Sequence, residues 1–463
     1  MLFRHPILIP LATVLLLFSA CQEYALAPLP GNYVGKVFYS VDLNNYDGDA
    51  QNSSADAAPY TLTISNPANN QERATVEIRQ MGGEGLYIKE NIEYGTLETF
   101  DMPRWDAEDS FLGNRSVHIE SSVPVAIHQF NPANNVGVYS NDASLLLPEV
   151  ALGTRYRAAC WPQGTSPNLL GAADYVTVVA TADSTTVTIT PTADVRAGLS
   201  VPATAAGSPL SVTLGQGEVL QIEGDNANTG VSDLTGSLIE ASAPVVVFSG
   251  NECAEIPADF DACDHIEEQL LPVEAWGTSY VAAKFSPRGT ETDVYRVMAD
   301  VDGTTIETVP SLDGFPATLD GGEYLEFDTD QDFELTASGP VAMVQYMTGS
   351  TWGEADVGDP AMVVLVPEEQ YLTEYMFLTP SGYQADYANI VARPGTEVTI
   401  DEQTVEASLW HEVASGEYSI ARARLEPGIH HLVASQETGL VVYGYDQEVS
   451  YAYPGGANLG GEE

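Results

Sequence analysis

The chain has 463 residues and carries 66 Asp and Glu residues against 16 Lys and Arg residues, which gives a formal net charge of −50. A phosphate backbone or an anionic membrane surface is bound by clustered basic residues, so this charge excludes unassisted nucleic-acid binding and a polybasic membrane patch. Hydrophobic residues make up 44% of the chain, which is enough for buried cores and argues against intrinsic disorder.

Residues 1–20 are predicted to be an export signal that is not part of the fold. A short basic start is followed by an apolar run from Ile7 to Phe18 and by two small residues before Cys21. This run is too short for a good membrane-spanning helix, as is usual for a segment that is removed from the mature protein. No later apolar run approaches 18 residues.

The ending of this segment, LFSAC at residues 17–21, resembles the lipobox of bacterial lipoproteins. The resemblance implies that Cys21 becomes the first mature residue and carries acyl chains, and that residues 21–32 form a tether. Phe18 departs from the pattern, which usually has Leu, Val or Ile, so an ordinary signal peptide with a nearby Cys is the alternative. Gln22 in place of Asp implies sorting to the bacterial outer membrane, with the protein lipid-anchored at the cell surface.

Beyond residue 32 the sequence predicts an all-β chain. Alternating stretches rich in Val, Thr, Tyr and Ile, such as VTVVA at 176–180 and TVTIT at 186–190, are separated by Gly, Asp, Asn or Pro. Turn residues at a spacing of about 8–12 residues are typical of sandwich or barrel modules.

Internal repeats support this interpretation. A strand that begins after a small residue and a proline occurs as SVPVAIHQF, SAPVVVFSG and SGPVAMVQY, with a degenerate fourth copy, TGLVVYGY, at 438–445. A second repeat places an Asp before a Pro that is followed eight residues later by a Tyr. Its three copies are Asp142, Pro148 and Tyr156; Asp264, Pro272 and Tyr280; and Asp359, Pro367 and Tyr375. We expect structural roles for these residues, with the Asp capping a turn before the Leu-Pro or Val-Pro strand.

The repeats divide the chain into four expected modules at 33–130, 131–250, 251–346 and 347–452, followed by a C-terminal tail at 453–463. The first module lacks the Asp-Pro-Tyr segment and is predicted to be an atypical cap. A unit of roughly 100 residues favours tandem β-sandwich-like modules. A four-bladed propeller-like arrangement is the alternative, although a propeller blade needs only about 45 residues.

Two cysteines are predicted to pair. Cys253 and Cys263 lie ten residues apart in a loop that contains Pro and Asp. An exported protein favours a disulfide there, whereas two separate thiols are the alternative. Cys160 is predicted to be a small buried residue and not a nucleophile.

Several stretches identify a family. FYSVDLNN at 38–45, HQFNP at 128–132, CDHIEEQLLPVEAWG at 263–277 and YAYPGG at 451–456 resemble the N-terminal domain family of the IgG Fc-binding protein, over nearly the whole mature chain. The resemblance implies an extracellular β-rich binding module. It does not imply that a bacterial member binds antibody, and it carries no Fc-contact residue over to this sequence.

No motif predicts catalysis. The seven His residues show no HExxH or similar spacing, and GxSxG and P-loop motifs are absent, so we expect no catalytic residue, no enzyme activity and no cofactor. Weak calcium candidates are Asp300, Asp302, Asp328 and Asp330, although a hairpin turn and an acidic surface loop explain them equally well. Four alternating tyrosines near the C-terminus could form a recognition face or pack between modules; they are Tyr443, Tyr445, Tyr451 and Tyr453.

These observations favour a surface-exposed, lipid-anchored binding or adhesion protein with an extracellular protein or glycan as ligand. A structural envelope or scaffold protein is the alternative, and a polysaccharide-acting enzyme is a more remote one, because paired carboxylates are plentiful but unspecific. The acidic residues are spread over all modules, and Lys is scarce, which resembles adaptation to salt.

Overall fold

The computed structural model of the chain describes residues 33–45, 60–67, 70–82, 85–103, 109–133, 140–162, 172–225, 232–258, 260 and 262–459. Within these residues the structure is all-β: strands are joined by turns and short 3-10 helices, and no α-helix is present. The predicted export signal, Cys21 and the tether lie outside the described residues. No helix in the described part is long and apolar enough to cross a membrane.

The first module consists of two sheets that share one long strand. The first half of the long strand pairs with β1 and β3, and its second half pairs with β2 and β8; β4 and β5 form the outer edges. The strands are β1 (Gly35–Val41), β2 (Thr61–Asn66), β3 (Ala74–Gln80), β4 (Tyr87–Ile92), β5 (Thr96–Asp101), the long strand β7 (Ser116–Phe130) and β8 (Ala143–Leu146).

The second module has the same two sheets, but its long strand is divided at Pro244 into β14 and β15. One sheet has the order β12-β11-β14-β9 and the other β16-β15-β10-β13-β6. The strands are β6 (Phe111–Gly113), β9 (Arg155–Arg157), β10 (Asp174–Ala180), β11 (Thr185–Thr190), β12 (Leu210–Leu214), β13 (Val219–Glu223), β14 (Leu238–Ala241), β15 (Val245–Glu255) and β16 (Cys263–Gln269).

The third module repeats the pattern around the long strand β22, with the order β20-β19-β22-β18-β21 and with β17 and β23 also paired to β22. Its strands are β17 (Gly277–Ala282), β18 (Asp293–Ala299), β19 (Thr304–Val309), β20 (Ala317–Leu319), β21 (Tyr324–Thr329), β22 (Phe333–Met347) and β23 (Ala361–Val364).

The fourth module is built around the long strand β30, with the order β27-β26-β30-β25-β29-β28 and with β24 and β31 also paired to β30. Its strands are β24 (Leu372–Thr379), β25 (Ala385–Ala392), β26 (Val398–Ile400), β27 (Gln403–Thr404), β28 (Trp410–Glu412), β29 (Ser419–Leu425), β30 (Gly428–Asp446) and β31 (Val449–Pro454). Short 3-10 helices are η3 (Glu149–Ala151), η5 (Val273–Ala275), η6 (Glu368–Gln370) and η7 (Ala407–Leu409).

The Asp-Gly and Pro-Gly pairs at 302–303 and 394–395 suit hairpin turns, but the strands that they join do not pair with each other: β18 and β19 both pair with β22, and β25 and β26 both pair with β30. Gly303 connects β18 to β19 with φ +74°, and Gly395 follows β25 with φ +87°. This left-handed backbone is accessible to glycine without steric cost. After each turn the chain continues in the same direction along its long strand, so the turn separates two strands that pair with different halves of that long strand.

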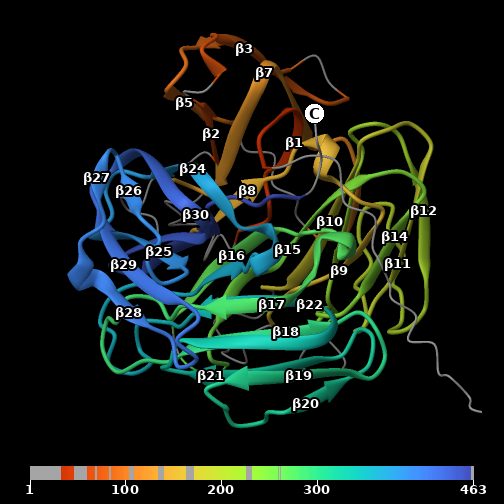
Figure 1. The fold of residues 1–463 in the computed structure, drawn as a ribbon. Coiled ribbons are helices and arrows are strands. Elements are labelled where there is room, and N and C mark those ends of the chain that lie inside the picture. Colours follow the sequence, from red (N-terminus) through yellow and green to blue (C-terminus); the bar gives the residue numbers. More distant parts are fainter. Residues whose placement is uncertain are drawn as a thin grey trace, which may run out of the picture.

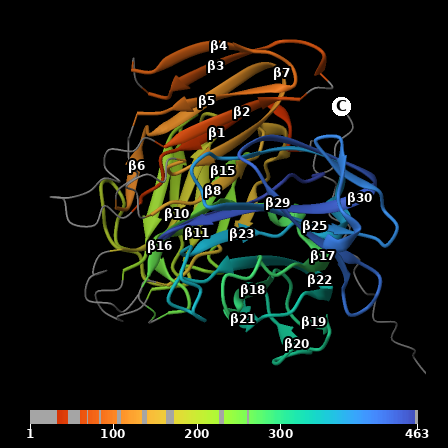
Figure 2. The ribbon, with the colours of Figure 1, turned by 90° about the vertical axis from the view of Figure 1, so that its left-hand side faces the viewer.

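The four modules surround a common centre, as Figures 1 and 2 show. The strand that follows each long strand lies at this centre; these inner strands are β8, β16, β23 and β31. Each pairs antiparallel with its long strand and also contacts the inner strands of the two neighbouring modules, so that the four form a closed ring. The individual modules are therefore sandwich-like, while their placement is circular, as in the propeller-like alternative.

The sheets extend beyond the expected module boundaries. The expected boundaries at 130/131, 250/251 and 346/347 lie at or near the ends of the long strands β7, β15 and β22. In the structure each long strand is hydrogen-bonded to the inner strand on the far side of that boundary, for example Phe130 to Ala143. Each module is therefore defined by its sheets, and the inner strand that follows a long strand belongs to the same module as that long strand.

The described ends of the chain meet between the first and fourth modules. The backbone N–H of Tyr33 donates to the carbonyl of Ala457 at 3.2 Å, and the N–H of Met376 donates to the Tyr33 hydroxyl at 3.2 Å. Asn458 adds a bond from its N–H to the Gln370 carbonyl at 2.9 Å. Residues from both ends of the sequence thus close the ring.

Candidate functional site

The repeated tyrosines lock the first strand of a module onto its long strand. The hydroxyls of Tyr156, Tyr280 and Tyr375 are buried, and each accepts the backbone N–H of the residue three positions earlier. Each hydroxyl also donates to a carbonyl of the long strand: Val245 at 2.7 Å, Val341 at 2.6 Å, and Thr438. Burial raises the pKa of all three tyrosines, so the hydroxyls keep the proton that they donate.

The repeated prolines set the spacing between modules. Pro148, Pro272 and Pro367 precede the helices η3, η5 and η6 and pack against a glycine of the preceding module. A Cβ atom on Gly153 would lie 2.5 Å from the Cβ of Pro272, and Gly35 and Gly277 face Pro148 and Pro367 in the same way. Because there is no room for a side chain, glycine is required at this contact.

The first Asp of the repeat does more than the expected turn capping. The carboxylate of Asp142 accepts backbone N–H groups from Ala143 at 2.9 Å, Glu267 at 3.2 Å, Met362 at 3.0 Å and Ala452 at 3.1 Å. These four donors belong to β8, β16, β23 and β31. One fully buried side chain therefore joins the inner strands of all four modules.

The other two copies of this Asp make fewer links. Asp264 accepts the N–H of Asn141 at 2.6 Å, which connects the second module to the first. Asp359 accepts the N–H of Ser350 at 3.1 Å and thereby caps the loop between β22 and β23, the one copy that acts as expected. Burial raises the pKa of Asp359 to about 6 and that of Asp142 and Asp264 well above the ordinary range, although backbone N–H bonds oppose the shift.

Arginines fill the contact between the second and third modules. Asp300, directly after β18, accepts the Arg155 Nη1 at 2.5 Å and the Arg157 Nε at 2.8 Å. Burial by itself raises the pKa of Asp300, but the hydrogen bonds from Arg155 and Arg157 outweigh burial and hold this pKa below its ordinary value. Asp300 is thus an ion-pair partner of another module and is not placed as a calcium ligand.

The equivalent contact between the third and fourth modules contains a cavity of about 400 Å³. Arg155 lies two residues after Gly153, and the equivalent residue after Gly277 is Ser279. Arg393, directly after β25, takes the place of Asp300. At this position the third and fourth modules therefore have a serine and an arginine where the second and third modules have an arginine and an aspartate that pair with each other.

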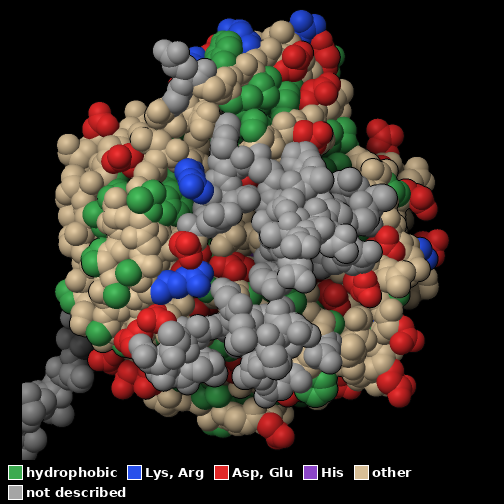
Figure 3. Space-filling view, turned by 180° about the vertical axis from the view of Figure 1, so that it is seen from behind, with side chains coloured by type: hydrophobic (Ala, Val, Ile, Leu, Met, Phe, Trp, Pro, Cys, Tyr) green, Lys and Arg blue, Asp and Glu red, His purple; other side chains and the backbone are tan. Residues whose placement is uncertain are grey.

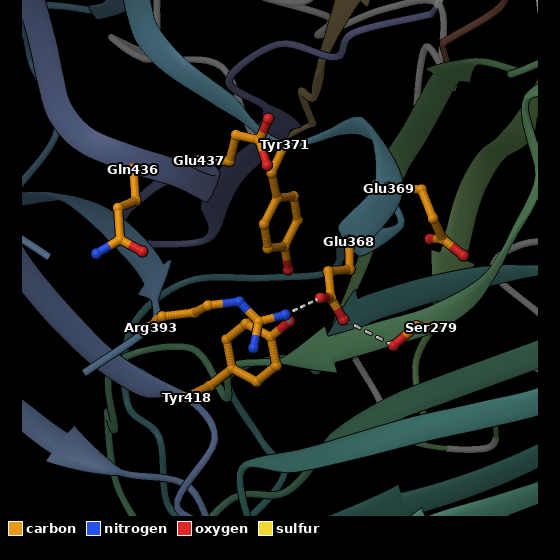
Figure 4. Close-up of a pocket in the computed structure, with 8 residues that line it drawn as sticks. All are labelled: Ser279, Glu368, Glu369, Tyr371, Arg393, Tyr418, Gln436 and Glu437. Atoms are coloured by element: carbon orange, nitrogen blue, oxygen red, sulfur yellow. Dashed lines mark hydrogen bonds and ion pairs between the residues drawn. The ribbon is translucent and has the colours of Figure 1, made fainter. Parts of the chain in front are cut away.

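Figure 4 shows the lining of this cavity, which we call the seam cavity: Ser279, Glu368, Glu369, Tyr371, Arg393, Tyr418, Gln436 and Glu437. The Arg393 guanidinium points toward the Glu368 carboxylate, pairs with it, and donates to the Tyr418 hydroxyl at 2.8 Å. Ser279 donates to the other Glu368 oxygen at 2.9 Å. Glu368 is therefore held from both modules.

The remaining lining groups differ in how far they are paired. Glu369 accepts the N–H and the hydroxyl of Thr278 at 3.1 and 3.0 Å. Gln436 and Glu437, on β30, are exposed and make no hydrogen bond or ion pair to another described residue. The cavity thus presents an unpaired amide, an unpaired carboxylate and the half-exposed Arg393 beside the Tyr371 ring.

A second cavity of about 500 Å³ lies between the first and fourth modules and includes Thr379. There the His430 Nδ1 lies 2.8 Å from the Asp401 Oδ2, and its Nε2 lies 3.0 Å from the Thr379 hydroxyl, an order that resembles a catalytic triad. However, the Nε2 is also 2.8 Å from the Glu426 carbonyl, to which Thr379 donates. A nitrogen that donates to a carbonyl cannot accept the hydroxyl proton, so this group is structural.

The other predicted residues are placed as follows. Cys253 and Cys263 form a disulfide, and Cys160 is a free buried thiol. The four alternating C-terminal tyrosines are buried, so they pack inside the molecule and form no recognition face. Asp302, in the turn between β18 and β19, accepts the N–H of Gly321, while Asp328 and Asp330 are exposed. Within the described ranges, no three His, Cys, Asp or Glu side chains converge as a metal site.

Sequence reasoning missed the arginines. Arg296, Arg155 and Arg393 look like isolated charges in the sequence, yet each lies at a contact between modules. Alignment of the repeats against one another would have shown Arg155 opposite Ser279 and Asp300 opposite Arg393. Acidic side chains, by contrast, are scattered over the described surface, as the back view in Figure 3 shows.

Comparison with known proteins now decides the family. A family model described as IgGFc binding protein matches residues 142–444, from Asp142 into β30. The chain belongs to this family. It is 29% identical over 412 residues to the IgGFc-binding protein of Homo sapiens, and the match covers 86% of this chain but 7% of the human protein. No solved structure matches this IgGFc-binding family member. The family is one of binding proteins.

Proposed function

We propose that the chain is an extracellular binding or adhesion protein, anchored by lipid on Cys21 at a bacterial outer membrane and cell surface, with a protein or glycan as its ligand. Its membership in the IgGFc-binding family carries this proposal. The disulfide between Cys253 and Cys263 supports an oxidising compartment outside the cytosol.

The module contacts support binding by a rigid scaffold. The Asp142 bonds and the packing of the repeated prolines against glycines fix the modules relative to one another, while the disulfide and the repeated tyrosines hold strands together within a module. Both cavities lie on the flanks of the fourth module, between elements that these contacts hold in place. A preformed, rigid pocket costs little ordering free energy when a ligand binds.

The binding arm of the test uses the full chain, labelled and applied to arrays of extracellular matrix proteins, IgG Fc and glycans. We expect saturable binding to at least one protein or glycan. Uniform absence of binding to the arrays and to intact cells would contradict the proposal. IgG Fc is included because of the human protein's name, and binding to it is one positive outcome among several.

The anchoring arm compares the wild-type chain with Cys21→Ala in a bacterial host fed a labelled fatty acid. We expect label and membrane fractionation for the wild type, and loss of both for the variant. Cys160→Ala is the matched control, because this buried thiol lies within the fold. Equal labelling of the wild type and Cys21→Ala would remove the lipid anchor from the proposal while leaving ligand binding in place.

A further inference from the structure

The seam cavity is open because one side chain of the repeat is short. At the contact between the second and third modules, Arg155 and Arg157 reach Asp300 and occupy the space. At the contact between the third and fourth modules, Ser279 leaves this space empty. The repeat itself therefore shows which substitution would fill the cavity.

The hydrogen-bonding groups of the cavity include both donors and acceptors. Glu437 can only accept, Arg393 can only donate, and Gln436 can do both. A sugar hydroxyl donates and accepts at the same oxygen, so the hydroxyls of a saccharide can bond to donors and to acceptors of the lining alike. A ligand that offers donors alone, such as an ammonium group, gives no acceptor to the N–H groups of Arg393 that Glu368 and Tyr418 do not use, and it adds a like charge beside the guanidinium.

The charge of the lining further narrows the ligand class. The lining contains three carboxylates, on Glu368, Glu369 and Glu437, and one guanidinium, on Arg393, so it is acidic. Glu417 lies a further 4.0 Å from the Arg393 Nη1. Sialylated, sulfated or phosphorylated ligands are therefore repelled. The Tyr371 ring supplies an apolar wall against which the C–H face of a sugar can pack.

From these observations we infer that the seam cavity binds a neutral saccharide unit of a glycan. This inference rests on the proposed binding function and names its ligand class and its site. Glu437 and Gln436 are the recognition groups, because in the described structure their polar atoms are not committed to other residues. Arg393, fixed by Glu368 and Tyr418, is a donor at the cavity wall.

The test applies the labelled full chain to an array of neutral, sialylated, sulfated and amino-sugar glycans, and determines affinities for hits by calorimetry. Ser279→Arg copies Arg155 and fills the cavity, so it is expected to weaken neutral-glycan binding at least tenfold while the thermal unfolding temperature is kept. Thr305→Arg is the matched control, since it adds the same charge at an exposed position on β19. Glu437→Gln should weaken glycan binding severalfold. Its control is Glu307→Gln, which changes an exposed acid on β19 and should leave glycan binding unchanged.

Each outcome decides the inference. Preference for neutral glycans, lost in Ser279→Arg and kept in Thr305→Arg, supports it. Equal binding by both arginine variants, or preference for acidic or amino sugars, overturns it while the proposed binding function stands. Binding to a protein but to no glycan also overturns the inference while the proposed binding function stands. Absence of every ligand, protein or glycan, would contradict both the inference and the proposed function.

Discussion

The guanidinium of Arg296 lies 4.4 Å from the centre of the Trp161 ring, across the contact between the third and second modules. The Tyr324 ring lies 4.6 Å away, and the guanidinium also donates to the Cys160 carbonyl at 2.6 Å and pairs with Asp233 at 3.1 Å. Burial by itself lowers the pKa of Arg296. Asp233, together with nearby tyrosines and Glu326, outweighs burial and raises this pKa, so the side chain stays charged. A buried cation with this many partners is a strong link between modules.

Arg296→Ala is therefore expected to destabilise the chain by about 3–5 kcal/mol, because it removes the cation that pairs with Asp233 and one of the donors to the Cys160 carbonyl. Thermal and denaturant unfolding measure the change. The control is Arg73→Ala, which removes an exposed pair with Glu93 and should change stability little. Similar losses for the two variants would mean that the buried arginine contributes no more than a surface one.

Asp142→Asn tests the centre of the ring. An amide offers one oxygen where the carboxylate offers two, so about two of the four backbone N–H groups lose their acceptor, at roughly 1–3 kcal/mol each. We expect a lower unfolding temperature and faster proteolysis between modules. Asp313→Asn, at an exposed loop position, is the control. A variant as stable as the wild type would show that the carboxylate does not hold the inner strands together.

Gly277→Ala tests the spacing of the modules. The added Cβ collides with Pro367, and overpacking of this kind costs about 1–3 kcal/mol. Gly113→Ala is the matched control, because nothing lies within 4 Å of the new Cβ there. Circular dichroism melts of both variants give the comparison, and an unchanged melt for Gly277→Ala would mean that the contact yields without cost.

Stability should fall as pH rises from about 4 to 7. Burial raises the pKa of Asp174 to about 7 and of Asp386 to about 6, against roughly 3.9 in an unfolded chain. The folded state therefore binds more protons than the unfolded state in this window, so its stability is fully present below pH ~4 and is lost as pH rises through 6 to 7. The loss is on the order of 2–3 kcal/mol per group.

Asp386→Asn isolates one of these groups. The amide oxygen can still accept the Tyr451 hydroxyl, but the side chain no longer titrates. We expect a flatter stability profile between pH 4 and 7 and a gain at pH 7, measured by unfolding at each pH. Asp328→Asn, which is exposed, should leave the profile unchanged. A stability profile that is steeper for Asp386→Asn than for the wild type would contradict the raised pKa of Asp386.

The local parts of this structure could be predicted from the sequence. Asp302-Gly303 indicated a turn, although the expected hairpin is not formed because β18 and β19 both pair with β22. Alternating Val and Thr indicated strands, and the ten-residue spacing of Cys253 and Cys263 indicated the disulfide. These features depend on neighbours in the sequence. The constant interval from Pro148 to Tyr156 also indicated a repeated structural role, which the hydroxyl bonds explain.

The contacts between modules could not be predicted in the same way. Asp142 finds Met362 and Ala452 on strands far along the chain, and nothing near Asp142 in the sequence specifies them. The cavity depends on a side chain being short relative to its counterpart in another module. That difference has meaning only after the modules are superimposed in space.

The closed ring has a consequence for how the chain unfolds. In an open array of repeats the terminal units have one neighbour, so they fray first and the array unravels from its ends. Here the bonds of Tyr33 to Ala457 and to Met376 give the first and fourth modules a second neighbour. Every module is therefore an interior one, and the chain is expected to lose its structure in a single cooperative step.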